Sequence, residues 1–172
     1  YVAGFSITAS LVAAEFGGTV SAKGNSKGIG NDTDLALLIA LRRQSEVILT
    51  SGKTFRCDQY KFPKSADLAV LTEQNLEVEA PAGQRYTLLR NGYTSSILEL
   101  KNAGYSRIHV ECGVTGISKL VEERQLDALV LSSQSIVGLK ALASKLGVDP
   151  IAVELSDLYV GLVAWQPKRF DS

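Results

Sequence analysis

The segment RIHVECGVTGISKLVEERQLDALVLS, residues 107–132, decides the fold. Its apolar beginning, 107–111, predicts a buried strand that ends in an acid, Glu111. The residues Ile117, Leu120 and Val121 then repeat at helical spacing over 116–125, and 126–132 is again rich in Leu and Val. A strand, a helix and a second strand in this order are typical of a parallel βαβ unit, so the sequence predicts an α/β protein.

The rest of the chain shows the same alternation of strand and helix patterns. Asn31 or Asp32 is placed to cap a helix that ends near Arg42 and Arg43, where cations suit the helix dipole. A helix over 135–146 is predicted to end at Gly147. Further strands are predicted at 2–8, 19–22, 46–50, 68–72 and 86–89, a helix from Thr94 or Ser95 to Ala103, and one or two antiparallel strands within 151–165. No linker or repeat divides the chain, so 1–172 is expected to be a single domain.

Composition excludes several classes of partner. A chain of 172 residues with 45% hydrophobic residues has enough apolar material for one core. The 18 Lys and Arg residues balance the 18 Asp and Glu residues, so no basic field would attract nucleic acid or a membrane surface, and a small-molecule ligand is expected. No apolar run reaches the roughly 18 to 20 residues of a membrane span, and only two cysteines are present, which favours a cytoplasmic protein. One histidine and two scattered cysteines do not make a zinc site, so no metal is expected.

The loop after Glu111 is the first candidate site. The first turn of a helix leaves backbone N–H groups unpaired at its positive end, and a Gly-containing entry lets a phosphate approach them. Gly113, Val114, Thr115 and Gly116 are predicted to form such a loop. Glu111 itself stands at the carboxyl end of a strand, where open α/β sheets bind ligands. Ordinary turn chemistry and an exposed strand-end acid are the alternatives.

The segment TSGKTFRCDQY, residues 50–60, is the second candidate. Gly52, Lys53 and Thr54 imitate the end of a P-loop, but that motif requires glycine at position 47, which is valine. What remains is a strand-end loop with polar side chains that suit a ligand or simply face solvent. A third candidate is Ser26, in the glycine-rich stretch KGNSKGIG.

These segments together resemble a known family. QSEVILTSGKTFRCDQ, RIHVECGVTGISKLVEERQLDALVLS and GNSKGIGNDTD are similar, in the same order, to motifs in the reductase domain of bacterial riboflavin-biosynthesis deaminase-reductases. The resemblance runs from about residue 2 to 132. It implies a dihydrofolate-reductase-like fold with three layers, in which helices flank a mostly parallel sheet closed by an antiparallel C-terminal hairpin. It also implies a homodimer that uses NADPH to reduce the ribose of an aminopyrimidine ribosyl phosphate to the ribityl form.

The resemblance assigns roles to individual residues. Ser26 and Arg42 would contact the pyrimidine substrate, with Glu111 beside it as the candidate catalytic residue. Residues bordering the cofactor would be Thr54, Asp58, Thr72, Gly113, Val114, Thr115, Gly116 and Ile117. The loop after Glu111 is thus singled out both by its backbone amides and by the resemblance.

The chain departs from the family pattern at several positions, and the loss of one acid supports a second hypothesis. The family's acid after the first strand is, in register, Gly17, although Glu15 offers a carboxylate two residues away. Cys112 and Val114 replace a glycine and a proline of the family's V-E-G-G-P motif. A catalytically inactive or repurposed relative that binds a nucleotide or pterin-like ligand is therefore the alternative to an active reductase. His109 and Cys112 are interpreted as structural residues of the strand.

Overall fold

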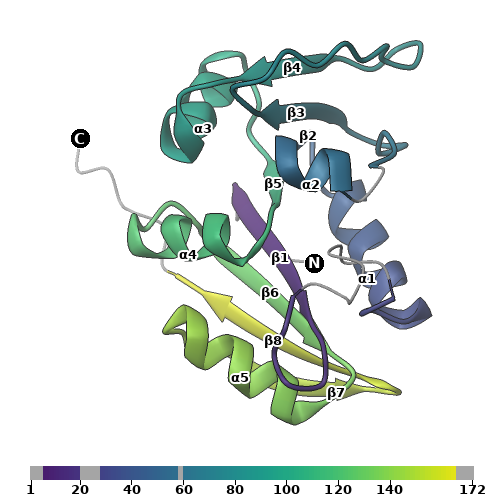
Figure 1. Ribbon diagram of the computed structural model, residues 1–172, viewed down its shortest axis with the longest axis vertical. Helices are drawn as coiled ribbons and strands as arrows, with labels where there is room; N and C mark the ends of the chain where they lie inside the picture. The colour runs from purple at the N-terminus through teal and green to yellow at the C-terminus, as the bar shows by residue number, and fades with distance from the viewer. Residues whose placement is uncertain (1–5, 20–27, 58–59, 166–172) are drawn as a thin grey trace.

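The computed structural model describes residues 6–19, 28–57 and 60–165 of the chain (Figure 1). The segments 1–5, 20–27, 58–59 and 166–172 lie outside the described residues, and with them fall Ser26, Asp58 and most of the short strand predicted at 19–22. In chain order the elements are β1 (Ile7–Ala13), α1 (Asp32–Arg43), β2 (Val47–Ser51), α2 (Gly52–Cys57), β3 (Asp67–Leu71), β4 (Tyr86–Leu89), α3 (Gly92–Asn102), β5 (Ile108–Glu111), α4 (Val114–Glu122), β6 (Ala128–Ser133), α5 (Ile136–Leu146), β7 (Ile151–Leu155) and β8 (Leu158–Ala164).

One sheet contains all of these strands, in the order β4-β3-β2-β5-β1-β6-β8-β7. The six strands from β4 to β6 in that order run parallel to one another, whereas β8 is antiparallel to β6 and to β7. In Figure 1 the sheet runs from β4 at the top to the β7–β8 hairpin at the bottom. The predicted α/β fold, a mostly parallel sheet flanked by helices with an antiparallel C-terminal hairpin, is confirmed.

The first strand lies later in the chain than the sequence pattern predicted. A strand at 2–8 was expected, but β1 covers Ile7–Ala13, and residues 2–5 lie outside the described part. Its start is fixed by Asp127, whose carboxylate accepts hydrogen bonds from the amides of Ser6 and Ile7 at 2.9 and 2.8 Å. Small residues fill most of ITASLVA, so the strand lacks the strong β-branched pattern that identifies other strands of the chain.

Helices cover both faces of the sheet. On one face, α3, α4 and α5 bury side chains such as Leu100, Leu120 and Leu142 against the central strands. On the other face, Leu37 and Leu41 of α1 pack against a smaller cluster on β6 and β8 that includes Val130 and Val160. No helix among residues 6–19, 28–57 and 60–165 is long and apolar enough to span a membrane.

Local signals set two of the helices where the sequence predicted them. Asn31 caps α1, since its side-chain oxygen accepts a hydrogen bond from the amide of Asp34 at 2.9 Å. Ser135 caps α5 in the same way, and α5 ends at Gly147, which adopts a left-handed conformation with φ of 66°. The capping residues and the closing glycine thus mark the start of α1 and both ends of α5 in the sequence.

Candidate functional site

The carboxyl ends of the parallel strands meet at one edge of the sheet. In register, Thr50 of β2 lies opposite Glu111 of β5, and the fully buried Thr50 hydroxyl donates to the backbone carbonyl of Glu111 at 2.6 Å. Ser51 ends β2 itself, and Thr72 directly follows the last residue of the neighbouring strand β3. Polar groups from separate parts of the chain therefore converge where α/β proteins bind ligands.

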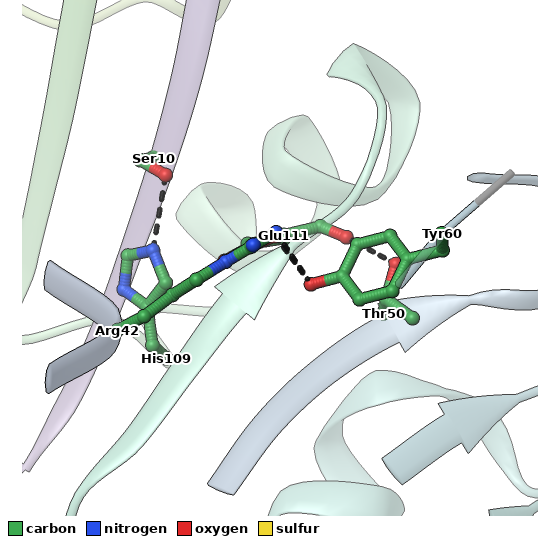
Figure 2. A network of polar contacts seen from close by, with 6 residues as sticks. All are labelled: Ser10, Arg42, Thr50, Tyr60, His109 and Glu111. Carbon is green, nitrogen blue, oxygen red and sulfur yellow. Dashed lines mark hydrogen bonds and ion pairs between the residues drawn. The ribbon is translucent and has the colours of Figure 1, made fainter. Parts of the chain in front are cut away.

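Glu111 is held by two residues from other elements. The guanidinium of Arg42, in the last turn of α1, donates from Nε to Oε1 and from Nη2 to Oε2 of Glu111, both at 2.6 Å. The Tyr60 hydroxyl donates to Oε2 at 2.5 Å and accepts from Nη2 of Arg42 at 3.0 Å. Figure 2 shows Arg42 and Tyr60 approaching Glu111 from opposite sides. The sequence placed Arg42 and Glu111 at one site, and the structure brings them into direct contact.

This cluster has a defined charge state near neutral pH. Burial lowers the pKa of Arg42, but the hydrogen bonds and opposite charge of Glu111 outweigh burial, so the pKa is raised above its ordinary value. Burial, reinforced by the charge of Glu111, also raises the pKa of Tyr60 well above its ordinary value. Arg42 is therefore cationic and Tyr60 keeps its proton. Both oxygens of Glu111 accept hydrogen bonds, so this side chain fixes the orientation of the Arg42 guanidinium and the Tyr60 hydroxyl.

A second polar group lies beside this cluster on the same face of the sheet. His109 precedes Glu111 by two residues on β5, and its ring is hydrogen-bonded through Nδ1 to Thr8 Oγ1 at 2.8 Å and through Nε2 to Ser10 Oγ at 3.0 Å. Burial lowers the pKa of His109 to about 4, so the ring is neutral at pH 7. The interpretation of His109 as a satisfied structural residue is confirmed, and its partners belong to the central strand β1 (Figure 2).

The loop predicted after Cys112 is in fact the first turn of a helix. The helix α4 begins at Val114 with Gly113 as its N-cap, two residues before the predicted start at Gly116. The amides of Gly116 and Ile117 both donate to the carbonyl of Gly113, at 3.0 and 3.1 Å, and the Ile117 side chain is fully buried. The amides of Gly113, Val114 and Thr115 are therefore the ones that this helix start offers to an anion.

The two glycines of this turn differ in their surroundings. A Cβ on Gly113 would have no atom within 4 Å, whereas a Cβ on Gly116 would lie 2.7 Å from both Cys112 Sγ and the Tyr93 hydroxyl oxygen. Gly116 is thus a packing residue, while Gly113 faces open space. Burial raises the pKa of Cys112 to about 12, and the side chain is only 4% exposed, so Cys112 is a structural residue as predicted.

The other predicted cofactor residues lie along the same edge. Thr54 is in the first turn of α2, where its amide and its hydroxyl are both hydrogen-bonded to Ser51 Oγ, at 3.0 and 2.9 Å. Thr72 directly follows β3 and packs so closely that a Cβ on Gly52 would lie 2.6 Å from it. The Tyr93 hydroxyl reaches the start of α4, where a Cβ on Gly116 would lie 2.7 Å from it.

A pocket of about 480 Å³ lies at the ends of β1 and β6, apart from Glu111. It is lined by Ala13, Ala14, Glu15, Gly28, Ile29, Gln134 and Ser135. Glu15, two residues before the position at which the family's acid was aligned, is the charged residue of this lining. Gly17 itself has φ of 84°, and a Cβ there would lie 2.7 Å from Cβ of Ala141. A side chain at position 17 would therefore strain the backbone and crowd Ala141, so an aspartate fits poorly in its place.

Tyr60 and Tyr93 were not identified from the sequence. Tyr60 closes the segment 50–60, but nothing in the local pattern shows that its hydroxyl reaches Glu111 on another strand. A tyrosine near a polar loop was the available signal, because its ring packs in a core while its hydroxyl requires a partner.

Within the described residues, no group of His, Cys, Asp and Glu side chains is arranged to hold a metal ion.

Comparison with known proteins places this geometry in a recognised fold. No protein-family model matches the chain, and no curated protein matches it significantly by sequence. Among solved structures, a pyrimidine reductase-like protein of Corynebacterium diphtheriae is similar with a TM-score of 0.67 and 15% identity, over 93% of this chain and 91% of that one. The riboflavin biosynthesis reductase of Saccharomyces cerevisiae gives a TM-score of 0.61 and 11% identity, over 92% of this chain and 89% of that one.

A bifunctional protein is similar over part of its length. The diaminohydroxyphosphoribosylaminopyrimidine deaminase/5-amino-6-(5-phosphoribosylamino)uracil reductase of Thermotoga maritima gives a TM-score of 0.64 and 16% identity, and the match covers 92% of this chain but 56% of that protein. Identities this low carry the fold and not the activity. The chain has the dihydrofolate-reductase-like fold of the riboflavin-biosynthesis pyrimidine reductases, which is the resemblance predicted from its sequence.

Proposed function

We propose that the chain is a single reductase-like domain that uses NADPH to reduce the ribose of an aminopyrimidine ribosyl phosphate to the ribityl form. The observation that carries the proposal is the cluster of Arg42, Glu111 and Tyr60 at the end of β5. The cluster holds the Arg42 guanidinium and the Tyr60 hydroxyl in fixed orientations at the carboxyl ends of the parallel strands. The solved structures that share this fold include reductases of riboflavin biosynthesis.

In this proposal Arg42 binds the substrate, while Glu111 and Tyr60 position its guanidinium. Arg42 uses Nε and Nη2 for Glu111 and Tyr60, and 21% of its side chain is exposed, so the remaining nitrogen Nη1 is the group assigned to a pyrimidine oxygen or a phosphate. Glu111 and Tyr60 keep the guanidinium of Arg42 in one orientation, which reduces the entropy lost when substrate binds. Ser26, outside the described residues, is proposed as a further substrate contact. A water molecule is assigned the proton transfer, because Glu111 is engaged as an acceptor.

The cofactor is assigned to the edge formed by Thr54, Thr72 and the start of α4. Bound NADPH would supply the hydride. The amides of Gly113, Val114 and Thr115 are positioned to bind a phosphate group, and the open space at Gly113 lets it approach. Asp58, Gly116 and Ile117 complete the set taken from the resemblance, but the amides of Gly116 and Ile117 are already bonded, which limits those two residues to shaping the turn.

A repurposed relative that binds a nucleotide or pterin-like ligand without turnover is the second candidate. It is favoured by one observation, the backbone at Gly17, where the acid that the family carries fits poorly. Glu15, in the neighbouring pocket, is the carboxylate that an active enzyme would use instead. The two functions therefore differ in whether Glu15 contributes to catalysis.

Turnover separates these functions. Purified protein is mixed with NADPH and the aminopyrimidine ribosyl phosphate, and consumption of NADPH is followed by absorbance. The reductase proposal predicts turnover that falls in Glu15→Gln and in Glu111→Gln, with Glu122→Gln on the exposed side of α4 as the matched control. If NADPH raises the melting temperature but no turnover occurs, the reductase proposal is wrong and the binding function takes its place. The expected effect of NADPH at 100 times its dissociation constant is an increase of about 2.7 kcal/mol in the free energy of unfolding.

We also propose that the protein is cytoplasmic and acts as a homodimer on a small molecule, without nucleic acid or membrane partners. The equal numbers of acidic and basic residues support the part of this proposal that concerns nucleic acid and membranes. Mass measurement in solution tests the homodimer, independently of turnover.

A further inference from the structure

The central strand β1 is covered on one face of the sheet and partly open on the other. Ile7, Ala9 and Ala13 are buried in the core that α3, α4 and α5 cover, as expected for the middle of an α/β sheet. Thr8 and Ser10 alternate with them, so their side chains point to the opposite face, where both are half-buried. Two hydroxyl groups thus lie where solvent or a ligand reaches the middle of the sheet.

A fully buried imidazole joins these two hydroxyls. His109 Nδ1 lies 2.8 Å from Thr8 Oγ1, and Nε2 lies 3.0 Å from Ser10 Oγ, the contact drawn in Figure 2. A hydroxyl both donates and accepts, whereas a neutral imidazole donates from one nitrogen and accepts at the other. The two hydrogen bonds therefore have two possible directions. In one, Nε2–H donates to Ser10 while Thr8 donates to Nδ1; in the other, both bonds are reversed.

This chain of groups can carry a proton without charging the ring. Burial lowers the pKa of His109 to about 4, so only about one ring in a thousand is cationic at pH 7. A neutral route avoids that rare state. When Ser10 gives its proton to a ligand, Nε2 gives its proton to Ser10 and Nδ1 takes the proton of Thr8. The ring then only exchanges one neutral tautomer for the other, and half-buried Thr8 regains a proton from solvent.

The Ser10 end of this chain lies beside the cluster that is proposed to bind the substrate. Ala9 of β1 pairs with Val110 of β5, so the next residues, Ser10 and Glu111, lie level with each other on the same face of the sheet. Glu111 in turn holds the guanidinium of Arg42. A ligand bound at Arg42 is therefore a neighbour of the Ser10 hydroxyl, whereas Thr8 lies two residues farther from the carboxyl ends of the strands.

The proposed reduction requires one proton besides the hydride. Hydride transfer from NADPH forms a new C–H bond at the anomeric carbon of the ribose and leaves NADP⁺. The bond between this carbon and the ring oxygen breaks, and its electron pair stays on the oxygen, which must take a proton to become the new hydroxyl of the ribityl chain. Bound substrate displaces water from the site, so this proton needs a route through the protein.

We propose that Ser10 gives its proton to the ring oxygen of the ribose, and that Thr8 and His109 replace this proton from solvent by tautomer exchange of the ring. Ser10 touches the substrate and is the catalytic residue of this chain, while His109 and Thr8 act through it. The water that supplies the proton then delivers it at Thr8. The inference rests on the proposed reduction for its substrate, but the hydrogen-bonded chain itself belongs to the folded protein.

The tautomer exchange is tested without substrate. Because His109 is the one histidine of the chain, isotope-labelled histidine gives a single pair of ring nitrogen resonances by NMR. Both of its partners are hydroxyls, so we expect both neutral tautomers at pH 7, with each resonance between the positions of a protonated and an unprotonated nitrogen. Thr8→Val removes the partner of Nδ1 and should leave one tautomer. A single fixed tautomer in the wild-type protein would overturn the proposal.

The proton route is tested by turnover. Thr8→Val keeps the shape of the side chain but removes the solvent end of the route, so kcat should fall by about 100-fold, the lower end of the usual contribution of proton transfer. KM should not change, and Thr8→Ser should restore kcat. The matched control is Thr33→Val, which removes a hydroxyl that donates to Asp157 at 2.7 Å and should lower the melting temperature without changing kcat. An unchanged kcat in Thr8→Val, or a change in KM alone, would refute the route.

The two proposals fail separately. Wild-type protein that turns over but holds one fixed tautomer would overturn the role of His109 and leave the reductase proposal intact. Wild-type protein without turnover would overturn the reductase proposal, and with it the ribose oxygen as the acceptor, whereas the NMR measurement would still decide whether the buried ring exchanges its proton between Thr8 and Ser10.

Discussion

The pairing of Arg42 with Glu111 gives the most specific test of the site's energetics. Arg42→Met keeps much of the volume of the side chain but removes both hydrogen bonds to Glu111, whose side chain is only 9% exposed. The carboxylate then stays in a largely water-excluded place with Tyr60 as its remaining donor. We expect a large loss of stability from this one change on the rim of the site.

The size of the loss follows from the burial of the pair. Removing one partner of a fully buried ion pair costs about 3–5 kcal/mol. Arg42 is 21% exposed, so water replaces part of the lost interaction, and the lower end, about 3 kcal/mol, is expected. For a chain of this length each kcal/mol shifts the melting temperature by roughly 2–4 °C, so the variant should melt about 10 °C lower.

Urea unfolding followed by circular dichroism measures this loss. A double-mutant cycle with Glu111→Gln should give a coupling energy of about 2 kcal/mol, because the double variant leaves no unpaired charge. Lys140→Met, on the exposed side of α5, is the control for replacing a surface cation by an apolar side chain. If Arg42→Met cost no more than this control, or if the cycle gave no coupling, the ion pair would not hold the site together.

Three further predictions follow from single residues. Burial lowers the pKa of His109, the one histidine of the chain, from 6.5 to about 4. Between these two pH values the imidazole is protonated in the unfolded state but not in the folded state. The free energy of unfolding should therefore fall by about 3 kcal/mol as the pH drops from 6.5 to 4. His109→Gln should flatten this part of the stability curve, and an equal slope in both proteins would contradict the burial of a neutral ring. Gly116→Ala should lower stability by about 1–3 kcal/mol through overpacking. Gly113→Ala should cost less, about 0.5–1 kcal/mol for a poorer N-cap, and should weaken NADPH binding measured by titration calorimetry. Unchanged binding would remove this turn from the cofactor site. Gly17→Asp should lower the free energy of unfolding by about 2 kcal/mol or more, since the new side chain would sit on a left-handed backbone and clash with Ala141. A rise in melting temperature would contradict this steric argument.

Elements with strong local signals were predictable from the sequence. The helix α1 starts after Asn31 and ends at Arg43 as its cap and charges indicated, β4 spans the predicted residues, and α5 ends at Gly147. The first strand was misplaced, because ITASLVA owes its position to Asp127 and to neighbouring strands rather than to its own propensity. The start of α4 was set too late, since Gly113 and Gly116 read as a loop although one caps the helix and the other packs inside it.

The candidate site was predictable in part. Arg42 and Glu111 were assigned to one site through resemblance, and the structure places them in contact. Their mutual neutralisation was not foreseen, because a separation of 69 residues in sequence carries no distance information. Tyr60 was missed for the same reason. Residues that act through local backbone geometry are visible in a sequence, whereas those that meet across the sheet are not.

The position of β1 has a consequence for how the chain is made. This N-terminal strand lies between β5 and β6, and its register pairs Ile7 with Ile108 and Thr8 with Ala128. A ribosome therefore releases β1 long before either neighbour exists, and β1 waits for its first partner until β5 has emerged at Glu111 and for its second until β6 has emerged at Ser133. Such distant pairing makes folding slow and its early products prone to aggregate. Fragments that end before β5 should accordingly depend on chaperones to stay in solution.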